Sequence, residues 1–157
     1  MRIAGTALAA VLLAMAVAST AHAQDQSTNS SSASGPAYTP ADETAGKGGD
    51  VAAIRRTMQH YLDAKDAKTA AMWARLGADK DDTACQIALA RLMEGDDLGK
   101  ADLVHAYMWV DIAYAKHDPD QGGDAEGLRD EIRHKMDVDQ VLDAKAAEGK
   151  WRTAHHH

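Results

Sequence analysis

A short pattern that occurs twice, 36 residues apart, constrains the fold of this chain more than any other feature of its sequence. The pattern is Asp-x-x-x-Ala-x-Met-Trp, and it occupies residues 66–73 and 102–109. A period of this size is that of one helix–turn–helix unit, and it is typical of proteins in which helical hairpins stack in a row. The repeat therefore predicts an all-α fold, a short α/α solenoid of antiparallel helical hairpins.

The spacing inside the pattern has a physical explanation. An aspartate at the N-cap accepts a hydrogen bond from a free backbone N–H group of the first helical turn. The alanine four residues later lets a neighbouring helix approach closely, and the tryptophan three residues after it lies on the same side and fills the groove between the helices. We therefore interpret Trp73 and Trp109 as packing residues, although an exposed aromatic pair could instead anchor a peptide.

Apolar residues at helical spacing predict about six helices, and no segment has the pattern of a strand. The clearest helix follows its expected N-cap, Asp102, and Pro119 and the pair Gly122-Gly123 end it. Gly95 stands where the preceding helix should end. Short connections between such helices imply antiparallel neighbours. Four of the predicted helices occupy approximately residues 51–63, 66–78, 82–94 and 124–136, and the helix that follows Asp102 has its apolar face from Leu103 to Tyr114. A sixth opens with Asp137 to Gln140, which approximate a capping box.

Part of the chain resembles a known helical repeat. The residues that carry the resemblance run Leu89-Ala90-Arg91-Leu92-Met93-Glu94-Gly95 and continue with Asp102, Ala106, Trp109 and Ala113. They are similar to the Sel1-like repeat, a relative of the tetratricopeptide repeat, whose members typically read Ala-x-x-x-Leu-Gly-x-x-Tyr-x-x-Gly-x-Gly-Val-x-x-Asp-x-x-x-Ala-x-x-Trp-x-x-x-Ala. The resemblance covers about residues 51–151 and implies a scaffold for protein–protein interaction. The structural signature of the repeat comprises Asp66, Ala70, Trp73, Gly95, Asp102, Ala106, Trp109 and Ala113.

The chain departs from this family pattern at several positions. Ala90 stands where glycine is usual, Met93 stands where tyrosine is common, and the Gly-x-Gly-Val turn is reduced to residues 95–99. In the first unit, Gly77 replaces the alanine that Ala113 provides in the second. These departures leave the number of repeats open, near two plus a capping pair. The alternative is an unrelated helical bundle in which the pattern recurs by chance.

The first 23 residues have the features of a secretory signal peptide. Arg2 makes the start basic, an apolar run over residues 3–17 follows, and Ala21 and Ala23 occupy the positions that a signal peptidase recognises. The apolar run is shorter than the roughly 20 residues that a bilayer-spanning helix needs. We therefore expect cleavage after Ala23, a periplasmic or secreted location, and no membrane insertion of the mature chain.

Composition divides the remaining chain into three parts. Residues 24–49 are rich in Ser, Gly and Thr and contain little to bury, which predicts a disordered linker. Residues 50–152 form the predicted repeat domain, and residues 153–157 form a predicted disordered tail that contains histidines.

Residues with potential chemistry do not form a recognisable site in the sequence. The acidic loop that begins at Asp118 has Gly123 at the sixth position of an EF-hand, but Arg129 stands where that loop needs a bidentate glutamate. Cys85 lies in an apolar run typical of a buried thiol, and the histidines at 60, 105, 117 and 134 lack metal-ligand spacing. We therefore expect no enzyme activity, no cofactor and no metal site. The alternatives are an envelope metal-binding protein that uses the C-terminal histidines and acidic loops, and a cell-wall hydrolase with paired carboxylates.

The predicted solenoid would expose an inner surface lined by the first helix of each hairpin. Candidate contacts on that surface are Arg55, Gln59, Gln86 and Arg91. The formal net charge of −7 and the lack of a basic face argue against binding to nucleic acid or anionic lipid. We expect the chain to be an adaptor that binds a protein or peptide in the bacterial envelope.

Overall fold

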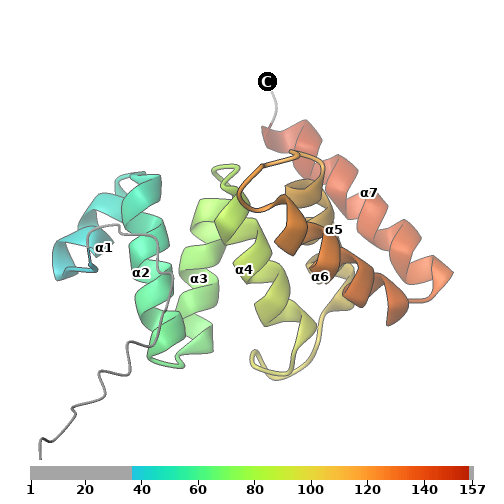
Figure 1. Cartoon of the computed structure of the whole chain (residues 1–157), viewed down its shortest axis with the longest axis horizontal. Coiled ribbons are helices and arrows are strands. Elements are labelled where there is room, and N and C mark those ends of the chain that lie inside the picture. Colours follow the sequence, from blue (N-terminus) through green and yellow to red (C-terminus); the bar gives the residue numbers. More distant parts are fainter. Residues whose placement is uncertain (1–36, 156–157) are drawn as a thin grey trace, which may run out of the picture. The chain divides into compact units, whose positions relative to one another are not determined.

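The computed structural model describes residues 37–155, in which seven α-helices follow one another along the chain (Figure 1). This part of the chain contains no strand, so the predicted all-α fold is confirmed. None of the helices in residues 37–155 is long and apolar enough to span a membrane. The predicted signal peptide, with its cleavage position after Ala23, lies outside the described residues. The helices are α1 (Pro40–Lys47), α2 (Val51–Asp63), α3 (Ala67–Ala78), α4 (Thr83–Glu94), α5 (Leu103–Tyr114), α6 (Gly122–His134) and α7 (Val138–His155).

The helices pack in the order in which they occur in the sequence. From α1 to α6 each helix contacts the next, and α7 packs against α5. Alternate helices also touch, since α2 contacts α4 and α4 contacts α6. The odd-numbered helices touch as well. Gly46 of α1 lies against Trp73 of α3, and the guanidinium carbon of Arg75 in α3 lies 5.1 Å from the ring centroid of Trp109 in α5. The hairpins therefore stack as in a short helical solenoid, and α2, α3 and α4 lie side by side in Figure 1.

Local caps explain where the helices begin. Four helices start after an aspartate whose carboxylate accepts a hydrogen bond from the backbone N–H three residues later, at 3.0–3.1 Å. In α7, Asp137 and Gln140 exchange two such bonds, at 3.0 and 2.8 Å. Gly122 and Gly123 begin α6, whereas the sequence predicts that they end the helix before it. The four capping aspartates are Asp50, Asp66, Asp82 and Asp102.

The repeated pattern places its alanines and tryptophans in the core. Both tryptophans are buried, which excludes an exposed aromatic pair. The methionines of the two units differ, because Met72 is 67% exposed whereas Met108 is 4% exposed. Met108 lines a hollow together with Ala147 and Trp151 of α7, which lies against α5. The buried pattern residues are Ala70, Trp73, Ala106 and Trp109.

Helix α1 lies within residues 24–49, where the composition predicts a disordered linker. Tertiary contacts explain this difference. Asp42 of α1 accepts a hydrogen bond from Arg56 of α2 at 2.5 Å, and this bond lowers the pKa of Asp42 to about 2. A Cβ added to Gly46 would lie 2.8 Å from the ring of Trp73, so α1 is closely packed on α3. The linker prediction is therefore wrong for α1, because its polar composition does not reveal the partners that hold it.

The C-terminal helix extends through His155, into the segment 153–157 that the sequence predicts to be disordered. The ring of His155 stacks on Trp151 at 4.6 Å, and Trp151 in turn packs edge-on against Trp109 at 5.4 Å. These ring contacts order the last turns of α7 against α5.

A buried carboxylate joins the last three helices. Asp111 of α5 accepts a hydrogen bond from Arg129 of α6 at 2.5 Å and another from Lys145 of α7. Burial raises the pKa of Asp111, but the hydrogen bonds from Lys145 and Arg129 outweigh that effect and hold it below its ordinary value. The ionised side chain therefore ties α6 and α7 to α5.

Candidate functional site

Two adjoining hollows lie along α4, on the side that faces α2 and α6. The first has a volume of about 330 Å³, and most of its lining residues are apolar. The second has a volume of about 360 Å³ and shares Arg91 with the first. We call the two hollows together the α4 groove. The first is lined by Met58, Gln59, Leu62, Ala84, Ile87, Ala88, Arg91, Leu92, Asp97 and Gln121, and the second by Arg91, Gly123, Asp124, Gly127, Leu128 and Glu131.

The floor of the groove is one face of α4. Ala84, Ile87, Ala88 and Arg91 recur at spacings of three and four residues, which places them on the same side of the helix. Ala84 and Ala88 are half-buried, and their small side chains leave the space that larger residues would fill. The opposite side of α4 packs in the core, where residues such as Cys85 are fully buried. Helix α4 is thus apolar on two sides, and the groove exposes one of them.

Arg91 is the cation of the groove. Its side chain is exposed, and it makes no hydrogen bond or ion pair with any other residue of the described segment. The carboxylates that line the second hollow have other interactions. Glu131 binds Lys135 at 3.0 Å, and Asp124 lies in the first turn of α6. Hydrogen bonding to Lys135 lowers the pKa of Glu131, so this carboxylate is ionised at neutral pH. The positive charge of Arg91 also contributes to the lowered pKa of Glu131, although no hydrogen bond or ion pair joins the two side chains. The N–H donors of Arg91 are therefore unused, beside an apolar surface.

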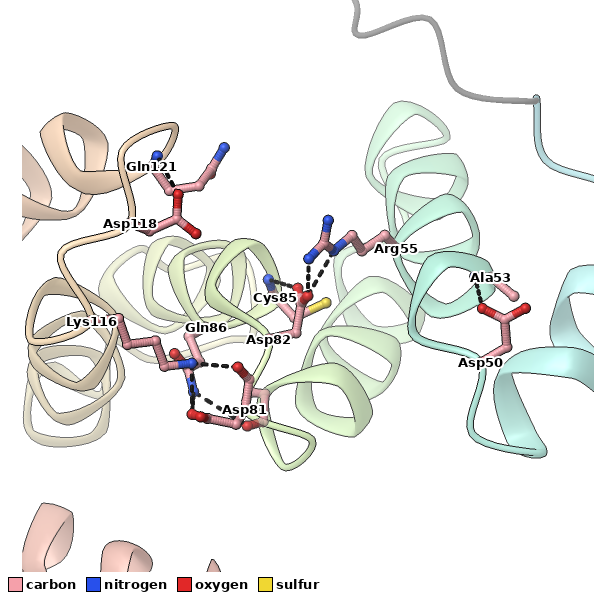
Figure 2. A network of polar contacts seen from close by, with 11 residues as sticks. Asp50, Ala53, Arg55, Asp81, Asp82, Cys85, Gln86, Lys116, Asp118 and Gln121 are labelled. Atoms are coloured by element: carbon pink, nitrogen blue, oxygen red, sulfur yellow. Dashed lines mark hydrogen bonds and ion pairs between the residues drawn. The ribbon is translucent and has the colours of Figure 1, made fainter. Parts of the chain in front are cut away.

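Arg55 has a structural partner instead of a free guanidinium. Its Nε donates to Asp82 Oδ2 at 2.7 Å, and its Nη2 binds the same oxygen (Figure 2). Asp82 also caps α4, accepting from the backbone N–H of Cys85 at 3.0 Å. Burial raises the pKa of Asp82, but the hydrogen bonds from Arg55 and Cys85 bring it below its ordinary value. Arg55 thus anchors α2 to the start of α4.

Gln86 is fully buried and cannot meet a partner on the surface. Its Nε2 donates to Asp81 Oδ1 at 3.2 Å and to the carbonyl of Ala78 at 3.4 Å. Lys116 reaches the same Asp81 carboxylate at 2.6 Å, so these residues fasten the turn between α3 and α4 to the end of α5 (Figure 2). Within the described segment, the buried Oε1 of Gln86 has no hydrogen-bond partner.

The groove therefore contains two of the four candidate contacts that the sequence suggests. Gln59 and Arg91 line it, whereas Arg55 is paired and Gln86 is buried. Sequence reasoning missed the apolar part of the surface, for which the signal was the small pair Ala84 and Ala88, one helical turn apart.

The remaining candidates for chemistry are dispersed. Among residues 37–155, no three His, Cys, Asp or Glu side chains lie close enough together to hold a metal ion. Asp118 accepts from the backbone N–H of Asp120 at 2.9 Å and thus closes its own turn. Burial raises the pKa of the Cys85 thiol, which is fully enclosed in the core and therefore poorly suited to act as a nucleophile.

Comparisons with known proteins return no relative: no protein-family model, no curated protein and no solved structure matches the chain. What the chain does must therefore be inferred from the groove and from the helices that form it.

Proposed function

We propose that the chain is a Sel1-like repeat protein that binds a segment of a partner protein in the α4 groove and so acts as a scaffold. The observation that carries this proposal is the groove itself, with its half-exposed apolar floor and the unpaired Arg91. Concave sites between helices that combine apolar side chains with a few polar groups are common places for a ligand to bind. Recognition of apolar anchor side chains in a groove between helices is a common mode of peptide binding.

Three features support membership in the Sel1-like family. The pattern recurs after 36 residues, both of its aspartates cap helices, and both of its tryptophans are buried between hairpins. Helices stacked by these contacts position α2, α4 and α6 so that they share a surface. That surface corresponds to the inner side of a solenoid, the side that such proteins commonly use for binding.

Export to the periplasm or the medium is part of the same proposal. It is supported by the basic start, the short apolar run and the small residues Ala21 and Ala23 in the first 23 residues. A catalytic role is not part of it. Within the groove, the ionisable residues are one arginine and three carboxylates, and no histidine or cysteine lines either hollow.

Site-specific photo-crosslinking in cells tests the proposal with the full chain. A photoreactive amino acid is placed at Ala88, on the floor of the groove, and for comparison at Met72, which is 67% exposed on α3. We expect a discrete crosslinked polypeptide from position 88 that is absent from position 72. A reactive residue at Ala84 should give the same crosslink in the otherwise wild-type chain. That crosslink should disappear in an Ala88→Trp background, since the indole would fill the first hollow. Equal crosslinking from both faces, or none from the groove, would argue against a docking function.

A further inference from the structure

We propose that the segment bound in the α4 groove has a single carboxylate that pairs with Arg91, next to an apolar side chain that sits on Ala84 and Ala88. This inference rests on the proposed function and specifies the chemistry of the partner.

The cations around the groove favour an acidic partner at one position. Of the residues that line its two hollows, Arg91 is the one with a positive charge. The other cations nearby are occupied: Lys135 binds Glu94 at 2.6 Å and Glu131 at 3.0 Å, and Arg55 binds Asp82. A guanidinium forms its strongest hydrogen bonds with carboxylates, often in pairs. An acidic side chain is therefore the group that this position recognises best.

The carboxylates of the groove limit how acidic the partner can be. Asp97 lines the first hollow, and Asp124 and Glu131 line the second. Asp124 is in the first turn of α6, where a negative charge is favoured by the helix dipole. Like charges brought against these residues would repel them. The groove therefore suits one acidic residue at Arg91 and disfavours an acidic run.

The apolar part of the groove sets the spacing that an occupant must match. Met58 and Leu62 of α2 form an apolar wall of the first hollow, and the small side chains of Ala84 and Ala88 leave space on its floor. Arg91 is three residues beyond Ala88, a rise of about 5 Å along the helix axis. An occupant must therefore present its apolar and acidic side chains at a similar spacing. Residues two apart in an extended segment, or three to four apart in a helix, satisfy this requirement.

The test is selection of random peptides of about twelve residues, displayed on phage, against the full chain in its wild-type form. We expect enriched peptides to contain one Asp or Glu within four residues of Leu, Ile, Met or Phe. A representative synthetic peptide should bind about tenfold more weakly to Arg91→Glu, by calorimetry or fluorescence anisotropy. Replacement of the peptide's acid by lysine should restore binding to this variant and weaken binding to the wild type.

Lys68→Glu is the matched control, because Lys68 is exposed on α3, lines neither hollow and undergoes the same change of charge. Its peptide affinity should equal that of the wild type, and circular dichroism melts should show that each variant folds. Peptides that bind without an acid preference, or bind Arg91→Glu equally well, overturn the inference and leave the proposed function intact. A wild-type chain that selects no peptide over Ala88→Trp counts against the proposed function itself. Self-association that Arg91→Glu abolishes, measured by sedimentation, would identify a second copy as the occupant and also overturn the inference.

Discussion

Replacement of Gly77 by alanine should destabilise the domain, although alanine normally stabilises a helix relative to glycine. Gly77 lies in α3 against Cys85 of α4. A Cβ at position 77 would be 2.3 Å from the Sγ and 2.7 Å from the Cβ of Cys85, and 3.1 Å from the Cγ2 of Ile54. Non-bonded carbon atoms in contact are normally about 3.5–4.0 Å apart. Helices α3 and α4 would therefore have to separate by a distance on the order of 1 Å.

The change in the free energy of unfolding of Gly77→Ala is the difference between two opposing effects. Alanine in a helix interior is favoured over glycine by about 1 kcal/mol. Overpacking of a core costs about 1–3 kcal/mol, and the upper value applies here because a Cβ cannot rotate away from its neighbours. The free energy of unfolding should fall by about 2 kcal/mol. With a denaturant dependence of about 2 kcal/mol per molar urea, the midpoint should fall by about 1 M.

Urea unfolding followed by circular dichroism measures this change, and Gly127→Ala is the matched control. Gly127 is inside α6, and a Cβ there would meet nothing within 4 Å. Gly127→Ala should therefore raise the free energy of unfolding by about 0.5–1 kcal/mol. Adding Cys85→Ala to Gly77→Ala removes the shortest contact and should recover part of the loss. A Gly77→Ala variant as stable as the wild type, or two glycine variants that shift the midpoint in the same direction, would contradict a steric clash with Cys85.

Three further predictions concern the core, an ion pair and the groove. Trp109→Ala should lower the free energy of unfolding by about 3–5 kcal/mol because the ring is fully buried, and an unchanged melting temperature would contradict this. Hydrogen bonds from Arg56 and from the backbone N–H of Thr39 lower the pKa of Asp42 to about 2, from an ordinary value of 3.8. Its contribution to stability is thus complete above a pH of about 4 and is lost as the pH falls towards about 2, so Asp42→Asn should lose less stability than the wild type over this interval. Arg55→Glu should lower the urea midpoint because it breaks the pair with Asp82 and sets two carboxylates together at the start of α4. Arg91→Glu should lower the midpoint less, because Arg91 forms no ion pair, and equal midpoints would refute the distinction.

The groove illustrates how one helix can satisfy both the core and a binding surface. In α4, Gln86 and Arg91 are separated by five residues, which corresponds to about 140° around the helix axis. They therefore point to different sides, and the residues between them are apolar on nearly every side. Helix geometry alone separates the two residues. Packing of α3 and α5 against α4 decides that Gln86 is buried and Arg91 exposed.

In the two copies of the repeated pattern, too, local helix geometry decides some features and tertiary packing decides others. Asp66 and Asp102 cap their helices in the same way, because capping depends on the backbone of a single helical turn. Met72 and Met108 have the same place in the pattern but opposite exposure, because α7 covers the second unit. Gly77 of the first unit replaces the alanine that Ala113 provides in the second, since Cys85 occupies the space where a Cβ at position 77 would lie.

The sequence by itself determined the local features of this protein: its all-α character, the starts of α2 to α5 and the 36-residue period of its hairpins. These follow from caps and helical periodicity, which act within one or two turns. Tertiary structure decided the rest. It formed α1 through the pair Asp42–Arg56, extended α7 to the ring of His155, and left one apolar side of α4 uncovered. Such outcomes depend on contacts between residues far apart in the chain, and no local pattern encodes which of two apolar helix faces a neighbour will cover.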